Sequence, residues 1–156
     1  MKKLQIGSLY LNEAKVPLIV TNDDATALIG GHYMPGAGAT LQSLLAASGL
    51  KRGSTHASSS LEEPGTFDLI GKPNPFTVAL IKEEHNIEEG SRTVMIGDRP
   101  NTDILFGKAA GVDQCLVMSG VVRGLDDFRQ NWLPKDPERY TPTYVMQMVG
   151  DLDATL

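Results

Sequence analysis

The fold of this chain is decided by the stretch Thr93-Val-Met-Ile-Gly-Asp98-Arg-Pro-Asn-Thr-Asp103. A short apolar run ends in a glycine, a carboxylate follows at once, and a second carboxylate comes at an expected helix start. Open α/β sheets bind their ligands at the carboxyl ends of the buried strands, which is where Asp98 is expected. Two carboxylates at this spacing can share a hard cation such as Mg²⁺, which takes oxygen ligands and keeps several waters.

A second expected strand end lies upstream and carries a lysine, in Phe67-Asp-Leu-Ile-Gly-Lys72-Pro-Asn-Pro75. A lysine beside a phosphoryl group orients it and offsets the repulsion between its oxygens and nearby carboxylates. Simpler interpretations stand beside this one: a lone lysine is usually a solvated surface residue, and Asp103 can serve as a helix N-cap. The lysine and the acid pair together indicate a phosphate site.

The apolar pattern around these two stretches alternates between strands and helices. Short apolar runs predict strands at 16–21, 67–70, 93–96, 114–118 and 143–149. Helical spacing and helix-ending glycines predict helices near 4–14, 35–49, 75–85, 103–110 and 125–132. Strands alternating with short helices predict βαβ units and a parallel sheet, so the expected fold class is α/β.

One polar segment interrupts this pattern. Residues 51–66 are rich in Ser, Gly, Lys and Glu and contain almost no apolar residues. We interpret the segment as an exposed loop. It is the best candidate for a boundary between an amino-terminal piece and the regular α/β part.

Composition excludes several classes of function. The 156 residues, 41% apolar and 21% charged, suit one globular domain, and the net charge of −5 gives no footprint for nucleic acid or an anionic membrane. No apolar stretch approaches the roughly 20 residues that span a bilayer. The start, Met1-Lys-Lys-Leu-Gln5, lacks the apolar core of a signal peptide. Cys115 is the single cysteine, so no intrachain disulfide can form, and we expect a cytoplasmic protein.

The residues also carry a family resemblance. Gly71-Lys-Pro-Asn-Pro75, followed by Met95-Ile-Gly-Asp98-Arg-x-x-Thr-Asp103-Ile-Leu-Phe-Gly107, resembles the third and fourth motifs of the haloacid dehalogenase (HAD) superfamily of phosphatases. Within it, the match is to the subgroup of 4-nitrophenylphosphatases, phosphoglycolate phosphatases and pyridoxal phosphatases. The segment at 51–66 is longer than the connection usual there. Further matches follow in the family's order at 19–26, 35–38, 108–111 and 116–120.

The resemblance implies an HAD-like Rossmannoid parallel sheet flanked by helices, with a remnant of the cap domain at the amino terminus. Residues 1–52 would be the carboxyl-terminal part of the cap, 53–66 a flexible linker, and 67–156 the second half of the core. It also implies Lys72 as the catalytic lysine that orients phosphate, Asp98 as a direct Mg²⁺ ligand and Asp103 as an outer-shell ligand. The substrate would be a small-molecule phosphate monoester, and the residues assigned to it are Asn22, Asp24 and Asn101.

The family's nucleophile is not visible in this sequence. Such phosphatases carry an amino-terminal Asp-x-Asp pair, whereas the similar stretch Leu18-Ile-Val-Thr-Asn22-Asp-Asp24-Ala-Thr26 has asparagine in the first place. An amide cannot attack phosphorus, so Asn22 does not replace a carboxylate. We therefore expect a member of a Mg²⁺-dependent phosphomonoesterase family that is inactive as this chain alone. The alternative is a non-catalytic, truncated relative that binds cations and anions or acts by association. A nucleotide-binding module is disfavoured because no glycine-rich phosphate loop follows a strand.

The missing half has a consequence for the sheet. In the family the nucleophile strand lies next to the strand that ends at Asp98, so 93–96 would have a bare apolar edge, and such edges pair. Two coverings are expected: residues 16–21 fold into the slot, or a second copy of the chain covers it. A homo-oligomer or another pairing at this edge is thus the predicted association. An edge open to solvent would contradict both.

Overall fold

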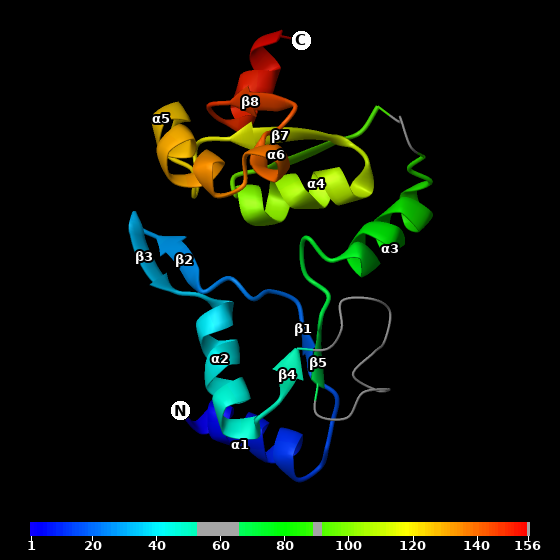
Figure 1. Cartoon of the computed structure of the whole chain (residues 1–156), viewed down its shortest axis with the longest axis vertical. Helices are drawn as coiled ribbons and strands as arrows, with labels where there is room; N and C mark the ends of the chain where they lie inside the picture. Colours follow the sequence, from blue (N-terminus) through cyan, green and yellow to red (C-terminus); the bar gives the residue numbers. More distant parts are fainter. Residues whose placement is uncertain (53–65, 89–91, 156) are drawn as a thin grey trace. The chain divides into compact units, whose positions relative to one another are not determined.

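The computed structural model describes residues 1–52, 66–88 and 92–155, which form two compact units, Met1–Asn74 and Pro75–Leu156 (Figure 1). The proposed linker at 53–66 lies outside the described residues except for Thr66, which begins a strand. Each unit has its own elements and its own apolar core.

The described residues of the amino-terminal unit form two helices, a parallel three-stranded sheet of order β1-β5-β4 and an antiparallel hairpin. In the sheet Ile19 lies opposite Asp68, and Lys51 lies opposite Thr66. The elements are α1 (Lys2–Asn12), β1 (Ile19–Val20), β2 (Thr26–Ile29), β3 (His32–Pro35), α2 (Ala37–Ser48), β4 (Lys51–Arg52) and β5 (Thr66–Leu69).

Apolar side chains of β1, β5 and α2 form the core of this unit. α2 stops at Gly49, whose φ of 69° is left-handed and whose N–H donates to the Leu45 carbonyl at 2.8 Å. α1 packs against α2, and the Asn12 side chain donates to the Ala47 carbonyl at 3.2 Å. The buried core residues are Val20, Leu41, Phe67 and Leu69.

Two details of this unit differ from the expectations. The ends of the expected loop at 51–66 are strands, because β4 and β5 pair through backbone groups that polar side chains do not prevent. The hairpin β2–β3 was not predicted. β1, which lies in residues 16–21, pairs with β5, and its Val20 joins their common core.

The carboxyl-terminal unit is built on the parallel sheet β6-β7-β8, as the alternating pattern predicted. Its strands and α-helices are α3 (Pro75–His85), β6 (Val94–Gly97), α4 (Leu105–Ala110), β7 (Asp113–Val117), α5 (Leu125–Asp127), α6 (Pro137–Tyr140) and β8 (Tyr144–Met146). The unit also contains two π-helical segments, η1 (Pro100–Ile104) and η2 (Phe128–Trp132), and two 3₁₀-helical segments, η3 (Leu133–Lys135) and η4 (Val149–Thr155), among its described residues.

Two apolar clusters fill this unit. One is formed by side chains of η1, β7 and the segment that follows β7, and contains Ile104, Leu116, Met118, Val122 and Phe128, with Trp132 and Leu133 packed against it. The other joins α3 to α4 and contains Val78, Phe106, Ala110 and Val112, with Ile81, Ile87 and Met95 beside it.

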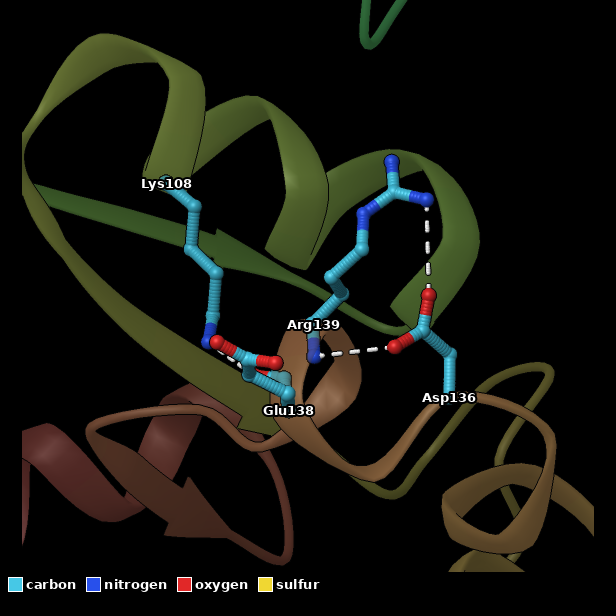
Figure 2. Close-up of polar contacts among 4 residues, drawn as sticks. All are labelled: Lys108, Asp136, Glu138 and Arg139. Carbon is cyan, nitrogen blue, oxygen red and sulfur yellow. Dashed lines mark hydrogen bonds and ion pairs between the residues drawn. The ribbon is translucent and has the colours of Figure 1, made fainter.

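A hydrogen bond joins α4 to α6, and two more bonds cap α6 (Figure 2). The Lys108 ammonium donates to the Glu138 backbone carbonyl at 2.8 Å. α6 itself is capped by Asp136, whose carboxylate accepts from the Arg139 N–H at 3.2 Å and from its guanidinium at 3.4 Å. The Lys108 bond thus joins α4 to α6, and the Asp136 bonds fix the first turn of α6.

Within the described residues β6 pairs with β7 alone, and 45% of Val94 is exposed. Covering of this edge, by residues 16–21 or by a second copy, stays a prediction. No helix among the residues that the structure describes is long and apolar enough to cross a membrane. Burial raises the pKa of the Cys115 thiol on β7, so this side chain stays a neutral thiol at pH 7.

Candidate functional site

Asp98 and Asp103 lie together where β6 ends. Asp103 is 4% exposed, and its Oδ2 accepts the backbone N–H of Asp98 at 3.1 Å and that of Arg99 at 3.0 Å. The Asp103 N–H in turn donates to the Arg99 carbonyl at 2.8 Å. A buried carboxylate is tolerated when backbone donors satisfy it. Asp103 therefore anchors the loop that carries Asp98.

The Asp103 carboxylate lies so close to residue 97 that only glycine fits at that position. A Cβ placed on Gly97 would overlap Cγ and Oδ2 of Asp103. The glycine that ends β6 is thus required for the close approach of the Asp103 carboxylate to the strand. This steric requirement explains why glycine precedes Asp98 in the sequence motif.

The two oxygens of the Asp98 carboxylate differ in their surroundings. Oδ2 accepts the backbone N–H of Val121 at 2.7 Å. Oδ1 accepts no hydrogen bond from the described residues of the carboxyl-terminal unit. The side chain is partly exposed, so Oδ1 can take a ligand from outside. A hard oxygen donor of this kind fits Mg²⁺.

The acid pair by itself is a small donor set. Among the residues that the structure describes, no group of three or more His, Cys, Asp or Glu side chains gathers in a metal-binding arrangement. Mg²⁺ sites often use only one or two carboxylates and keep several waters, so the pair fits this cation. Asn101, predicted to bind substrate, lies exposed on η1 between the two carboxylates in sequence.

Lys72 lies in the amino-terminal unit, directly after β5. The preceding Gly71 packs so closely on Thr21, the residue after β1, that a Cβ there would overlap the Thr21 carbonyl oxygen and lie 2.7 Å from its carbon. The Lys72–Pro73 peptide bond is cis. Asn74 closes the turn, because its N–H donates to the Gly71 carbonyl at 2.9 Å and its side chain donates to the Leu69 carbonyl. The exposed Lys72 is carried by this turn.

Asn22 and Asp24 follow the neighbouring strand β1. The Asn22 Oδ1 accepts the Asp24 N–H at 2.7 Å, an Asx turn. The Asp24 carbonyl accepts the Gly38 N–H at 2.8 Å, and a Cβ on Gly38 would lie 2.8 Å from the Asp24 carbonyl carbon. Because β1 and β5 are parallel, Asn22 and Lys72 leave the same edge of their sheet.

The predicted site residues thus form two groups. Lys72, Asn22 and Asp24 belong to the amino-terminal unit, and Asp98, Asp103 and Asn101 belong to the carboxyl-terminal unit. The sequence did not predict the Val121 N–H as a donor to Asp98, because a backbone group is not encoded by its side chain. The only sequence feature that points to a turn at this place is the pair Ser119-Gly120 before it.

Comparisons with known proteins identify the family. The profile of HAD-like hydrolases matches residues 69–152, more than half of the chain. The chain belongs to the HAD-like hydrolase family. Human chronophin is 30% identical over 151 residues, which are 96% of this chain and 45% of chronophin. The predicted resemblance is confirmed.

Two solved structures share the fold. The 4-nitrophenylphosphatase of Thermotoga maritima has a TM-score of 0.69 and 26% identity, covering 98% of this chain and 49% of its own. A glycerol phosphate phosphatase of Mycobacterium tuberculosis in complex with magnesium has a TM-score of 0.65 and 22% identity, covering 94% and 37%. The chain spans less than half the length of these relatives.

The anchoring role of Asp103 predicts a graded loss of stability. Asp103→Ala leaves two backbone donors without their acceptor and should lower the free energy of unfolding by about 1–3 kcal/mol. Asp103→Asn keeps an acceptor oxygen and should lose less. Fluorescence of Trp132, the single tryptophan, reports urea unfolding of this unit.

The exposed Asp126 provides the control. Asp126→Ala should change the free energy of unfolding by no more than about 0.5 kcal/mol. Equal stabilities of Asp103→Ala and Asp126→Ala would show that the Asp103 carboxylate does not anchor the loop.

Proposed function

We propose that this chain is part of a Mg²⁺-dependent phosphomonoester hydrolase that acts on small-molecule phosphates. One observation carries the proposal: in a member of the HAD-like hydrolases, the carboxylate Oδ1 of Asp98 is left for a ligand at the carboxyl end of a parallel strand. The relatives named above as phosphatases support the reaction class, and the neighbour in complex with magnesium supports the cation.

Each residue has a stated role in this proposal. Asp98 binds the cation through Oδ1, and Asp103 acts from the outer shell by holding the Asp98 backbone. Lys72 orients the phosphoryl group by its charge. When bound, Mg²⁺ supplies positive charge that offsets the negative phosphoryl oxygens. Substrate contacts are assigned to the loops that bear Asn22, Asp24 and Asn101.

The nucleophilic carboxylate comes from polypeptide outside these 156 residues. A carboxylate oxygen attacks phosphorus while the bond to the substrate oxygen breaks, and the leaving alkoxide takes a proton from a general acid. Water then hydrolyses the aspartyl phosphate. The edge of β6 beside Asp98 supports this assignment, since a parallel strand paired there would end near the acid pair.

The domain assignment follows from the same proposal. Residues 1–52 are the carboxyl-terminal part of a cap domain, and residues 67–156, which include most of β5, Lys72 and the sheet β6-β7-β8, are the second half of the catalytic core. The buried neutral thiol of Cys115 suits a reducing cytoplasm. If no second polypeptide completes the site, the chain is instead a non-catalytic relative that binds ions at its half-site.

The metal site is tested by Mn²⁺ titration followed by electron paramagnetic resonance, with Mg²⁺ as competitor. Asp98→Asn replaces a charged ligand by a weaker neutral one and should weaken Mn²⁺ binding by at least about tenfold. The exposed Asp126→Asn loses the same charge in the same unit and should bind as the wild type does. Equal weakening in both variants would indicate general electrostatics and refute the site.

Lys72 is tested by titration with inorganic phosphate in the presence of Mg²⁺. Lys72→Ala removes one charge-assisted contact and should weaken phosphate binding roughly tenfold. Lys3→Ala removes an exposed lysine of α1 and should leave the affinity unchanged. Unchanged phosphate affinity in Lys72→Ala would remove Lys72 from the proposal.

The missing nucleophile predicts that the isolated chain with Mg²⁺ does not hydrolyse 4-nitrophenyl phosphate, measured by release of 4-nitrophenolate. Activity of the isolated chain that Asp98→Asn abolishes would show that the nucleophile is present after all. Activity that Asp98→Asn leaves intact would come from a contaminating phosphatase, which the variant thereby exposes.

A further inference from the structure

The turn after β7 touches the Asp98 carboxylate more closely than any side chain at position 120 would permit. A Cβ placed on Gly120 would overlap Oδ2 of Asp98 and lie 2.6 Å from its Cγ. Gly120 is not among the glycines with positive φ, so its backbone conformation is open to other residues. Space next to Asp98, and not backbone geometry, therefore requires glycine here.

The two residues that follow hold Asp98 by their backbone. The Val121 N–H donates to Oδ2 at 2.7 Å, a charge-assisted bond, and the Val122 N–H donates to the Asp98 carbonyl at 3.3 Å. Both valines are buried, and Val122 is part of the cluster around Leu116. The donors are thus fixed to the core of the unit.

We propose that the turn Gly120–Val122 positions Asp98 for the cation. The Val121 N–H donates to Oδ2, so Oδ1 is the oxygen that would bind the cation, while Gly120 gives the carboxylate the room to lie against the turn. This inference rests on the proposed function. Gly120 and Val121 are positioning residues, because they act through Asp98 and do not contact the metal.

The turn and Asp98 follow two neighbouring strands and therefore lie side by side at the carboxyl end of the sheet. Asp98 follows β6 and Gly120 follows β7, which pair in parallel with Gly97 opposite Leu116. The Asp98 backbone is held from the other side by Asp103. The carboxylate is consequently clamped between the β6 loop and the β7 turn, and one added methyl group at position 120 suffices to displace it.

The test compares Gly120→Ala with Gly150→Ala, measured by Mn²⁺ titration of the full chain. A Cβ on Gly150 meets no atom within 4 Å and its φ is not positive, so this variant controls for a glycine-to-alanine change in the same unit. Gly120→Ala should weaken Mn²⁺ binding about tenfold or more while keeping a cooperative Trp132 unfolding transition. Gly150→Ala should bind as the wild type does.

Equal Mn²⁺ affinities of Gly120→Ala and wild type would overturn the positioning role and leave the metal site standing. A wild type that binds no Mn²⁺ would overturn the proposed function and this inference with it. If Gly120→Ala does not fold, amide hydrogen exchange replaces it. The Val121 amide should exchange at least tenfold faster in Asp98→Ala than in wild type, with Leu116 unchanged, and equal Val121 rates would overturn the proposal.

Discussion

The carboxyl-terminal unit depends on one interaction, the acceptance of the Asp98 and Arg99 N–H groups by Oδ2 of Asp103. A carboxylate that is 4% exposed needs donors, and these two supply them. The same two hydrogen bonds fix the backbone of the loop after β6, and in this loop the Asp98 carboxylate lies against the turn that follows β7. The wider π-helical turn η1 places Asp103 beneath the strand end and leads directly into α4. The anchoring residue Asp103 and the proposed metal ligand Asp98 therefore belong to one continuous motif.

Glycines set the geometry at the strand ends of both units. Gly97, Gly120 and Gly71 each lie where a side chain would overlap a neighbouring carboxylate or carbonyl. In a parallel sheet such close approaches gather at the carboxyl edge, because every strand delivers its following loop there. Removing the side chains lets polar backbone and carboxylate groups meet at hydrogen-bonding distance. The sheet thereby assembles a polar edge above an apolar core.

Sequence patterns identified the strands and helices that bury apolar faces, including β5, α3, β6 and β7, and the family motifs at Lys72 and Asp98. They missed the hairpin β2–β3, whose Gly30-Gly31 turn has positive φ at both residues but whose strands are largely exposed and lack a clear alternation. β4 pairs by backbone groups, which leave no trace in side-chain chemistry. The Val121 N–H was invisible for the same reason.

Under the proposed function, metal binding and strand pairing at β6 are thermodynamically coupled. A carboxylate brought beside Asp98 by an added strand repels it when no cation is present, and the repulsion is costly at a partly buried strand end. A bound divalent cation turns this repulsion into attraction. Each event must then raise the affinity of the other by the same factor. The hydrogen bonds from Val121 and to Asp103 strengthen this coupling, because they prevent the Asp98 carboxylate from rotating away from an added negative charge. A chain that carries half of such a site is thus expected to bind its cation weakly alone and more tightly when the β6 edge is filled.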